Sequence, residues 1–189
     1  MRGKCHLRRN ISENSFYSYV LAVGVRETNN SGSNQARWVV KIDAQSGSTV
    51  WQFELGNDAT WAGAKSGYET IAFTEDGGFV VGGFGKFQEE GFPAFKSGGQ
   101  VEQATPIIQK FSAETASATS VSSPAPVWSW VCGEGNNCST TGSTKALRVY
   151  KDNGVEKIAA VPGTRSAIVV VDGSNGNQLQ ERVICWKKT

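Results

Sequence analysis

Histidine is nearly absent from this sequence: the 189 residues contain one, His6, close to the N-terminus. A single histidine excludes most catalytic arrangements built on imidazole and metal sites built from several histidines. The sequence also contains no Ser-His-Asp set, no Cys-x-x-Cys pair, no Walker loop and no dinucleotide-binding fingerprint. We therefore expect no catalytic residues and no resident metal or cofactor.

Charge is also scarce, since 19% of the residues are charged and the formal net charge is +2. So small an excess does not favour nucleic acid or an anionic membrane surface as a partner. No apolar run approaches the length of a membrane span. The basic residues gather only at the ends, for example Arg2, Lys4, Arg8 and Arg9, and we expect residues 1–13 to be a flexible basic terminus.

The apolar run "FYSYVLAVGV" at residues 16–25 follows this basic segment and so imitates a signal peptide. The alternative is a β-strand, because "SYVLAVGV" is similar to "GGFVVGGFG" at residues 77–85. We favour the strand, which leaves no clear signal peptide in this chain.

The cysteine count is four, which is compatible with two disulfides. One of three pairings would join Cys132 to Cys138 and Cys5 to Cys185. A buried free thiol is the alternative for Cys132, because it continues the alternating face of Trp128 and Trp130. Asn-x-Ser triplets begin at residues 10, 29 and 137, and with the cysteines they favour an extracellular or cell-surface location.

Glycine and tryptophan are plentiful, with 22 and 6 residues, and they fall into an internal repeat. Residues 37–56, 105–133 and 165–184 each contain an apolar run, a turn and an alternating strand. The repeated positions include Asp43, Ser46, Gly47 and Trp51 in the first copy, Trp128 and Trp130 in the second, and Asp172 and Gly176 in the third. The third copy has Gln180 where the tryptophan would stand.

A second type of hairpin lies between these copies, at residues 68–85 and 146–163. Its turns are Asp76-Gly77-Gly78 and Asp152-Asn153-Gly154, which supply the positive φ angles that tight hairpins require. The sequence therefore predicts an all-β domain over residues 14–186 made of about three four-stranded antiparallel units. Long loops are expected at residues 86–104 and 112–126. We expect the core to contain Trp51, Phe53, Trp128, Trp130, Val39, Val80 and Val169.

The element Asp43-x-x-Ser46-Gly47-x-x-x-Trp51 resembles the tryptophan-docking motif of quinoprotein-like (PQQ-repeat) and WD40-like β-propellers. The resemblance implies four-stranded blades in which the tryptophans pack between neighbouring blades. About three blades fit in this chain, so an incomplete ring is expected. A further chain segment, a partner or self-association would complete it.

For function, the repeat favours a non-catalytic binding or scaffold module that recognises protein or glycan through loops 57–67, 86–104 and 133–144. Phe87, Phe92 and Phe95 would form part of this surface, or would instead fold back over the sheet. The alternative is a remnant of a PQQ-dependent sugar or alcohol dehydrogenase, although no residue set matches the quinone site of that family.

Residues 172–178, "DGSNGNQ", have oxygen-bearing side chains at Asp172, Ser174 and Gln178. This spacing is a weak match to a Ca²⁺-binding loop. The segment also aligns with the turn "DAQSGST" of the first copy, and we favour an ordinary β-turn.

Overall fold

The computed structural model describes residues 3–9, 18–27, 35–55, 66–85, 105–133, 142–163 and 167–183. These residues form an all-β fold with three antiparallel sheets, each with four strands, and one short helix. The fold class predicted from the repeat is confirmed at this level.

Each sheet is a meander in which consecutive strands are neighbours. The first sheet contains β1 (Gly3–Arg9), β2 (Ser18–Glu27), β3 (Gln35–Asp43) and β4 (Thr49–Leu55). The second sheet contains β5 (Gly67–Phe73), β6 (Phe79–Gly85), β7 (Thr105–Phe111) and β8 (Trp128–Val131). The third sheet contains β9 (Thr144–Asp152), β10 (Val155–Pro162), β11 (Ala167–Asp172) and β12 (Gln178–Val183).

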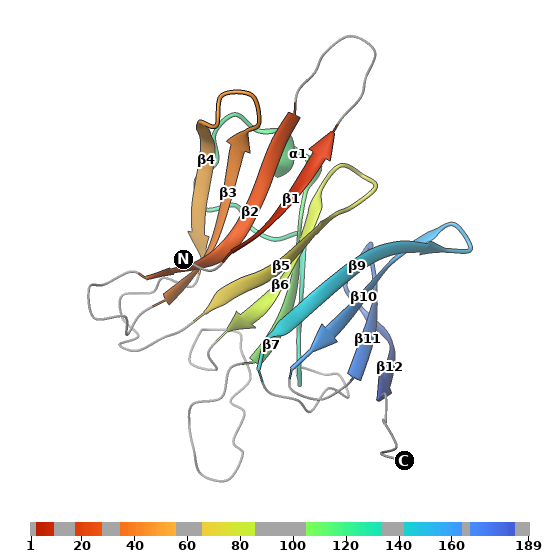
Figure 1. Cartoon of the computed structure of the whole chain (residues 1–189). Coiled ribbons are helices and arrows are strands. Elements are labelled where there is room, and N and C mark those ends of the chain that lie inside the picture. The colour runs from red at the N-terminus through yellow and green to blue at the C-terminus, as the bar shows by residue number, and fades with distance from the viewer. Residues whose placement is uncertain are drawn as a thin grey trace, which may run out of the picture.

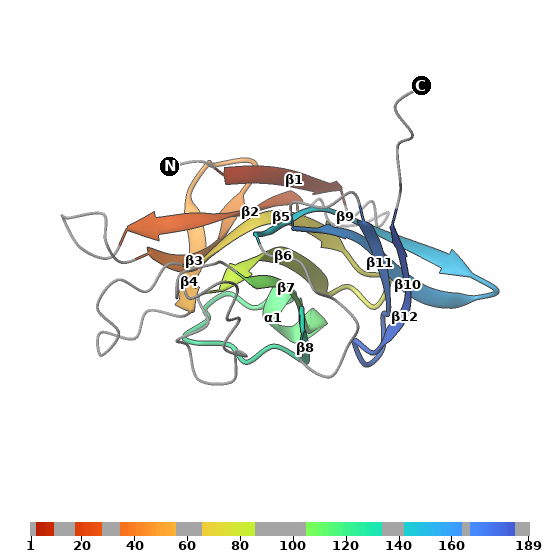
Figure 2. The same cartoon turned by 90° about the horizontal axis from the view of Figure 1, so that it is seen from below.

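The three sheets lie side by side in chain order, with the second between the other two (Figures 1 and 2). Contacts between sheets are concentrated at the first strands, because β5 lies against β1 and β2 on one side and against β9 on the other. Each sheet therefore extends outward from a shared inner region to a final strand at its outer edge.

One hydrophobic core lies between the first and second sheets. It contains Trp51 and Phe53 from β4 and Phe79 and Phe111 from the second sheet. Phe53 and Phe111 have ring centroids 5.4 Å apart, and Phe79 and Phe111 are stacked at 5.0 Å. These rings join the two sheets because each sheet alternates side chains between its two faces.

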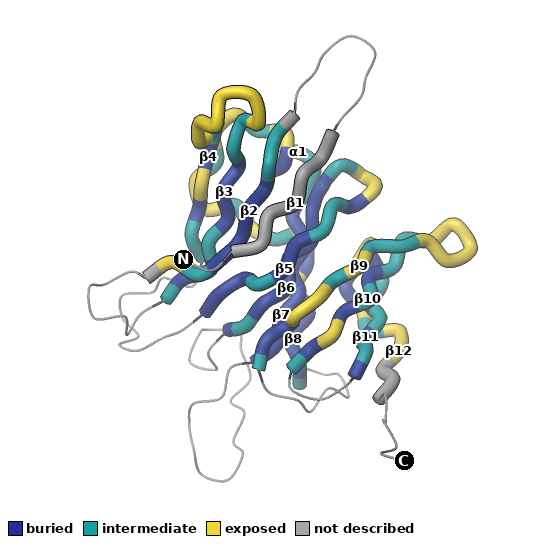
Figure 3. The backbone as a smooth tube through the Cα atoms, in the orientation of Figure 1, coloured by how far each residue is buried: buried dark blue, intermediate teal, exposed yellow. Residues whose placement is uncertain are grey.

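The other hydrophobic core lies between the second and third sheets. It contains Val80, Trp128 and Trp130 from the second sheet and Ile158 and Val169 from the third. The second sheet is therefore covered on both faces, and Figure 3 shows that buried residues run almost continuously through it. All seven predicted core residues are buried, from Val39, Val80 and Val169 at 0% exposure to Trp128 at 8%.

The N-terminal segment differs from the sequence-based expectation. Gly3–Arg9 forms β1, which pairs along its length with β2, where we expected a flexible terminus over residues 1–13. Cys5 and Leu7 alternate with basic residues, and this period of two is that of a strand. The run "SYVLAVGV" is the strand β2, as expected.

Residues 112–126, expected to be a long flexible loop, begin with the helix α1 (Ala113–Ser117). Ser112 caps this helix, because its hydroxyl accepts the backbone N–H of Thr115 at 3.3 Å. Ala116 is 1% exposed and packs on the first core. The connection from β7 to β8 is therefore a packed part of the interface between the first two sheets.

Candidate functional site

The predicted repeat turns are built on hydrogen-bonded aspartates. After β3, one carboxylate oxygen of Asp43 accepts the backbone N–H groups of Gln45 at 3.1 Å and Ser46 at 2.7 Å. Hydrogen bonds from Ser46 lower the pKa of the Asp43 carboxyl. Gly47 closes the turn at φ +72°, with its N–H on the Asp43 carbonyl at 2.9 Å.

The turn after β11 has the same construction. Asp172 accepts the N–H of Ser174 at 2.8 Å, and hydrogen bonds from Ser174 lower the pKa of its carboxyl. Gly176 has φ +75°, and its N–H meets the Asp172 carbonyl at 2.9 Å. The two turns thus share their backbone hydrogen bonds, and Gly173 occupies the place that Ala44 has in the first turn.

The other predicted hairpin turns also have the expected conformations. At the β5–β6 turn, Asp76 accepts the N–H of Gly78 at 3.0 Å, and Gly77 has φ +88°. At the β9–β10 turn, which follows Asp152, Asn153 and Gly154 have φ +52° and +79°. These residues shape the hairpins.

Lysine and tryptophan form a cross-strand pair that joins the first sheet to the second. Lys41 on β3 lies opposite Trp51 on β4. The Trp51 indole N–H donates to the Ala118 carbonyl at 3.0 Å. The Lys41 ammonium donates to the same carbonyl at 3.1 Å and to that of Ala116 at 2.8 Å. Both acceptors lie in or just after α1, in the segment that follows the third strand of the second sheet.

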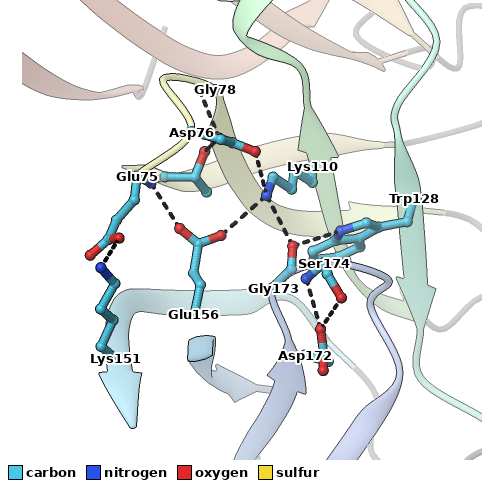
Figure 4. Close-up of polar contacts among 11 residues, drawn as sticks. Glu75, Asp76, Gly78, Lys110, Trp128, Lys151, Glu156, Asp172, Gly173 and Ser174 are labelled. Atoms are coloured by element: carbon cyan, nitrogen blue, oxygen red, sulfur yellow. Dashed lines mark hydrogen bonds and ion pairs between the residues drawn. The ribbon is translucent and has the colours of Figure 1, made fainter. Parts of the chain in front are cut away.

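The same pairing joins the second sheet to the third. Lys110 on β7 lies opposite Trp128 on β8. The Trp128 indole N–H and the Lys110 ammonium both donate to the Gly173 carbonyl, at 3.1 and 3.0 Å (Figure 4). We call this arrangement the Lys–Trp clamp: a cross-strand lysine and tryptophan of one sheet that hold a carbonyl following the third strand of the next sheet.

The third sheet has no such pair at the matching position. There Val170 on β11 lies opposite Gln180 on β12. The third repeat copy thus differs from the other two at both positions: it has Gln180 in place of the tryptophan, as predicted, and Val170 in place of the lysine. Both observed clamps have a lysine and a tryptophan at these paired positions, and the third sheet has neither residue there.

The two clamp lysines have different surroundings. Lys41 lies 4.5 Å from the centre of the Tyr19 ring and meets neutral carbonyls, and burial lowers its pKa. Lys110 pairs with Asp76 at 2.8 Å and Glu156 at 3.1 Å. Burial alone would lower the pKa of Lys110, but hydrogen bonds and charge from these two carboxylates raise it overall.

A groove of about 690 Å³ opens beside the second clamp, between the second and third sheets. Its charged lining consists of five carboxylates and one ammonium: Glu75, Asp76, Glu114, Glu156, Asp172 and Lys110. Val127 and Val155 also line it and are 57% and 49% exposed. The groove is therefore acidic with two exposed apolar side chains at its edge.

Several of the carboxylates are held in place by neighbours. Glu156 accepts the backbone N–H of Glu75 at 2.8 Å in addition to pairing with Lys110. Glu75 itself forms an exposed ion pair with Lys151 (Figure 4). Glu114 on α1 is exposed, and a hydrogen bond with Ser112 lowers the pKa of its carboxyl. This arrangement can attract and hydrogen-bond cationic groups.

The weak Ca²⁺ candidate uses its side chains in two separate contacts. Asp172 accepts from Ser174 inside the turn. Gln178 accepts the indole N–H of Trp130 at 3.1 Å. Across the seven described ranges, no group of three or more His, Cys, Asp or Glu side chains could hold a metal ion.

The cysteines and the aromatic loop are only partly covered by the structure. Cys132 is disulfide-bonded and fully buried. Cys5 lies in β1, of which only the backbone is described, and Cys138 and Cys185 lie outside the described residues. Phe87, Phe92 and Phe95 and most of loops 57–67, 86–104 and 133–144 also lie outside them. Their predicted role in recognition stays a prediction.

Lys41 and Lys110 are the clamp residues that we did not assign from the sequence. Each stands two positions before the first turn position of its repeat copy, inside an apolar run. A lysine at the same inward-facing position of two copies is the signal that could have identified them, since an ammonium is seldom buried without partners.

No protein-family model matches this sequence, and no curated protein matches it. Among the described residues, none belongs to a helix with the length and hydropathy needed to span a membrane.

Proposed function

We propose that this chain is a non-catalytic binding and scaffold module of the β-propeller type. The observation that carries the proposal is the repeated Lys–Trp clamp. Trp51 and Trp128 are the tryptophans of the propeller-like motif. Their indole N–H groups donate hydrogen bonds to carbonyls of the neighbouring sheet. Motif residues used in this way stabilise sheet packing, and a rigid stack of sheets is a suitable base for a recognition surface.

The groove beside the second clamp is the recognition site that we propose. Its carboxylates favour lysine or arginine side chains, and Val127 and Val155 offer apolar contact. A basic protein segment with interspersed apolar residues satisfies both features. A neutral glycan would use neither the excess negative charge nor the valines, so we favour protein as the ligand class.

An oxidising, extracellular or cell-surface setting is part of this proposal. The disulfide at Cys132 supports it, because structural disulfides persist chiefly in such compartments.

The proposal can be tested with a fluorescein-labelled peptide that combines lysine, arginine and valine, titrated with the full chain and followed by fluorescence anisotropy. We expect saturable binding that weakens as salt is added. Glu114→Gln should weaken binding about threefold, because it removes one exposed charge from the groove. Val155→Ser should weaken it by a similar factor, about threefold, through lost apolar contact.

Glu69→Gln is the matched control, because Glu69 on β5 is half-buried, pairs with the exposed Lys145, and is not part of the groove lining. It should bind as the wild type does. Equal binding of a peptide with glutamate in place of the basic residues would refute the proposal. So would equal effects of Glu114→Gln and Glu69→Gln, or binding of neutral oligosaccharides that competes with the basic peptide.

A further inference from the structure

We propose that the β3–β4 turn, Asp43–Gly47, is the acceptor for another Lys–Trp clamp. The clamp would come from a partner sheet: a four-stranded antiparallel sheet with a lysine on its third strand opposite a tryptophan on its fourth. This surface lies on the first sheet, away from the acidic groove, so the inference stands apart from the proposed recognition site.

The two observed clamps define what an acceptor is. In both, a lysine and a tryptophan that face each other across two strands share one carbonyl of the next sheet. That carbonyl belongs to Ala118 in the first clamp and to Gly173 in the second, and each follows the third strand of its sheet. By this rule the first sheet has its own acceptor, in the segment that follows β3.

The segment after β3 is built like the acceptor that Lys110 and Trp128 hold. Asp43 and Asp172 organise their turns with the same backbone hydrogen bonds, and Gly47 and Gly176 close them at φ +72° and +75°. Ala44 therefore stands in the place of Gly173. Its carbonyl corresponds to the one that the second clamp holds.

The space beside the β11–β12 turn is occupied by an indole, whereas the space beside the β3–β4 turn is open. A Cβ atom on Gly176 would lie 2.6 Å from Cε3 of Trp128, so the indole packs directly on that glycine. A Cβ atom on Gly47 would meet nothing within 4 Å. The volume that an indole fills at the third sheet is open at the first, and residues 44–48 are exposed.

The exposed part of this surface is the turn itself. Leu21 and Val39 face the first core, so the alternating positions Val20, Ala22 and Val40 lie on the opposite face of the sheet. Ala22 and Val40 are only 7% and 3% exposed, so that face is already largely covered. The exposed turn, with its open space beside Gly47, is therefore the feature that fits a partner of the same repeat type.

In the described strands of a second copy, no Lys–Trp pair is left over for the acceptor. Its first two sheets already use their clamps internally, and its third sheet carries Val170 opposite Gln180. The occupant must therefore be a sheet that brings both the lysine and the tryptophan. The partner therefore carries that pair, and the wild-type chain should not associate with itself through this turn.

Installing the missing pair on the chain provides the probe. In the full chain, Val170→Lys with Gln180→Trp gives the third sheet a clamp, which the β3–β4 turn of another copy can accept. We expect sedimentation velocity to show self-association at least about tenfold tighter than that of the wild type, from two added hydrogen bonds and the buried indole. Such a head-to-tail contact would produce dimers or longer assemblies.

Gly47→Asn in the same chain should suppress this association, because its Cβ occupies the space for the indole while asparagine tolerates positive φ. Gly154→Asn is the matched control, since Gly154 also has positive φ and open space but lies in the β9–β10 turn. It should leave the association unchanged. Circular dichroism would verify that each variant is folded.

If the double variant does not fold, Gln180→Trp alone can replace it as the probe, because Gln180 is exposed. The single variant should associate more weakly than the double variant, and Gly47→Asn should suppress its association in the same way. The proposal is overturned if neither variant associates, or if association is indifferent to Gly47→Asn. It is also overturned if the wild type associates just as tightly through a contact that Gly47→Asn removes, because the occupant would then be a second copy without the pair.

Discussion

Replacing Trp51 with alanine should lower the free energy of unfolding by about 3–5 kcal/mol. Trp51 is 4% exposed and stacks on Phe53 with ring centroids 5.6 Å apart. Its removal would leave a cavity between the first and second sheets and take the indole donor from the Ala118 carbonyl. Urea denaturation followed by circular dichroism measures the change.

Trp51→Phe separates the two contributions, because it retains an aromatic ring but no indole N–H. We expect it to cost about 1–2 kcal/mol. Trp38→Ala is the second comparison, since Trp38 is only half-buried and bonds to the exposed Gln52. It should cost less than Trp51→Ala. A loss below about 1 kcal/mol for Trp51→Ala would contradict its role between the sheets.

Replacing Lys110 with methionine should lower the free energy of unfolding by about 2–3 kcal/mol. The side chain of Lys110 is 7% exposed, and its loss leaves Glu156, 16% exposed, without its cation. The cost is below that of a fully buried pair because Asp76 is 53% exposed and remains hydrated. Lys41→Met is the matched variant, since it removes the other clamp lysine but breaks no ion pair.

The pH dependence of stability should identify this ion-pair cluster. Burial alone would raise the pKa of Asp76, but hydrogen bonds from Lys110, Thr74 and Gly78 hold it below the ordinary 3.8. The contribution of Asp76 is therefore present above about pH 3.8 and lost as the pH falls through the folded-state pKa. Lys110 has a raised pKa, so its contribution is present below pH 10.5 and lost as the pH rises through the folded-state pKa.

In Lys110→Met, the free energy of unfolding should therefore depend less on pH at both the acidic and the alkaline ends of the curve. At alkaline pH, Lys41 should change stability in the opposite direction to Lys110. Its pKa is lowered from 10.5, so its contribution to the free energy of unfolding becomes more favourable as the lysine loses its proton. Lys41→Met should remove that alkaline gain. Curves of the same shape for the two variants would contradict the assigned difference in their surroundings.

The hairpins and the core were predictable because local chemistry determines them. Glycines at Gly47, Gly77, Gly154 and Gly176 mark positive φ angles whatever surrounds them. Alternation places Trp51 and Trp128 on buried faces. The degeneracy of the third repeat copy was also predictable from the sequence, since Gln180 lies at the register position of the two clamp tryptophans.

The features that were missed depend on contacts between distant parts of the chain. The Ser- and Ala-rich segment 112–126 has a composition typical of surface loops, but Lys41 and Trp51 bind its carbonyls from another sheet. Backbone acceptors leave no trace in residue identity. β1 was missed because its basic residues indicate solvent, whereas strand pairing uses backbone groups that every residue has.

The acidic groove could not be predicted either. Glu114, Glu156 and Asp172 come from three separate segments, and only the packing of the third sheet on the second brings them to one groove. Lys110 lies within the second repeat copy, residues 105–133, but its partners Asp76 and Glu156 are far from it in the chain.

Hydrogen exchange of the tryptophan indole N–H groups tests the Lys–Trp clamp most directly. In an ¹⁵N-labelled sample, NMR would follow the loss of each assigned indole proton after transfer to D₂O. We predict that those of Trp51 and Trp128 exchange only through large-scale unfolding, and that the proton of half-buried Trp38 exchanges much faster. Exchange of Trp51 and Trp128 as fast as that of Trp38 would contradict the clamps and the sheet packing built on them.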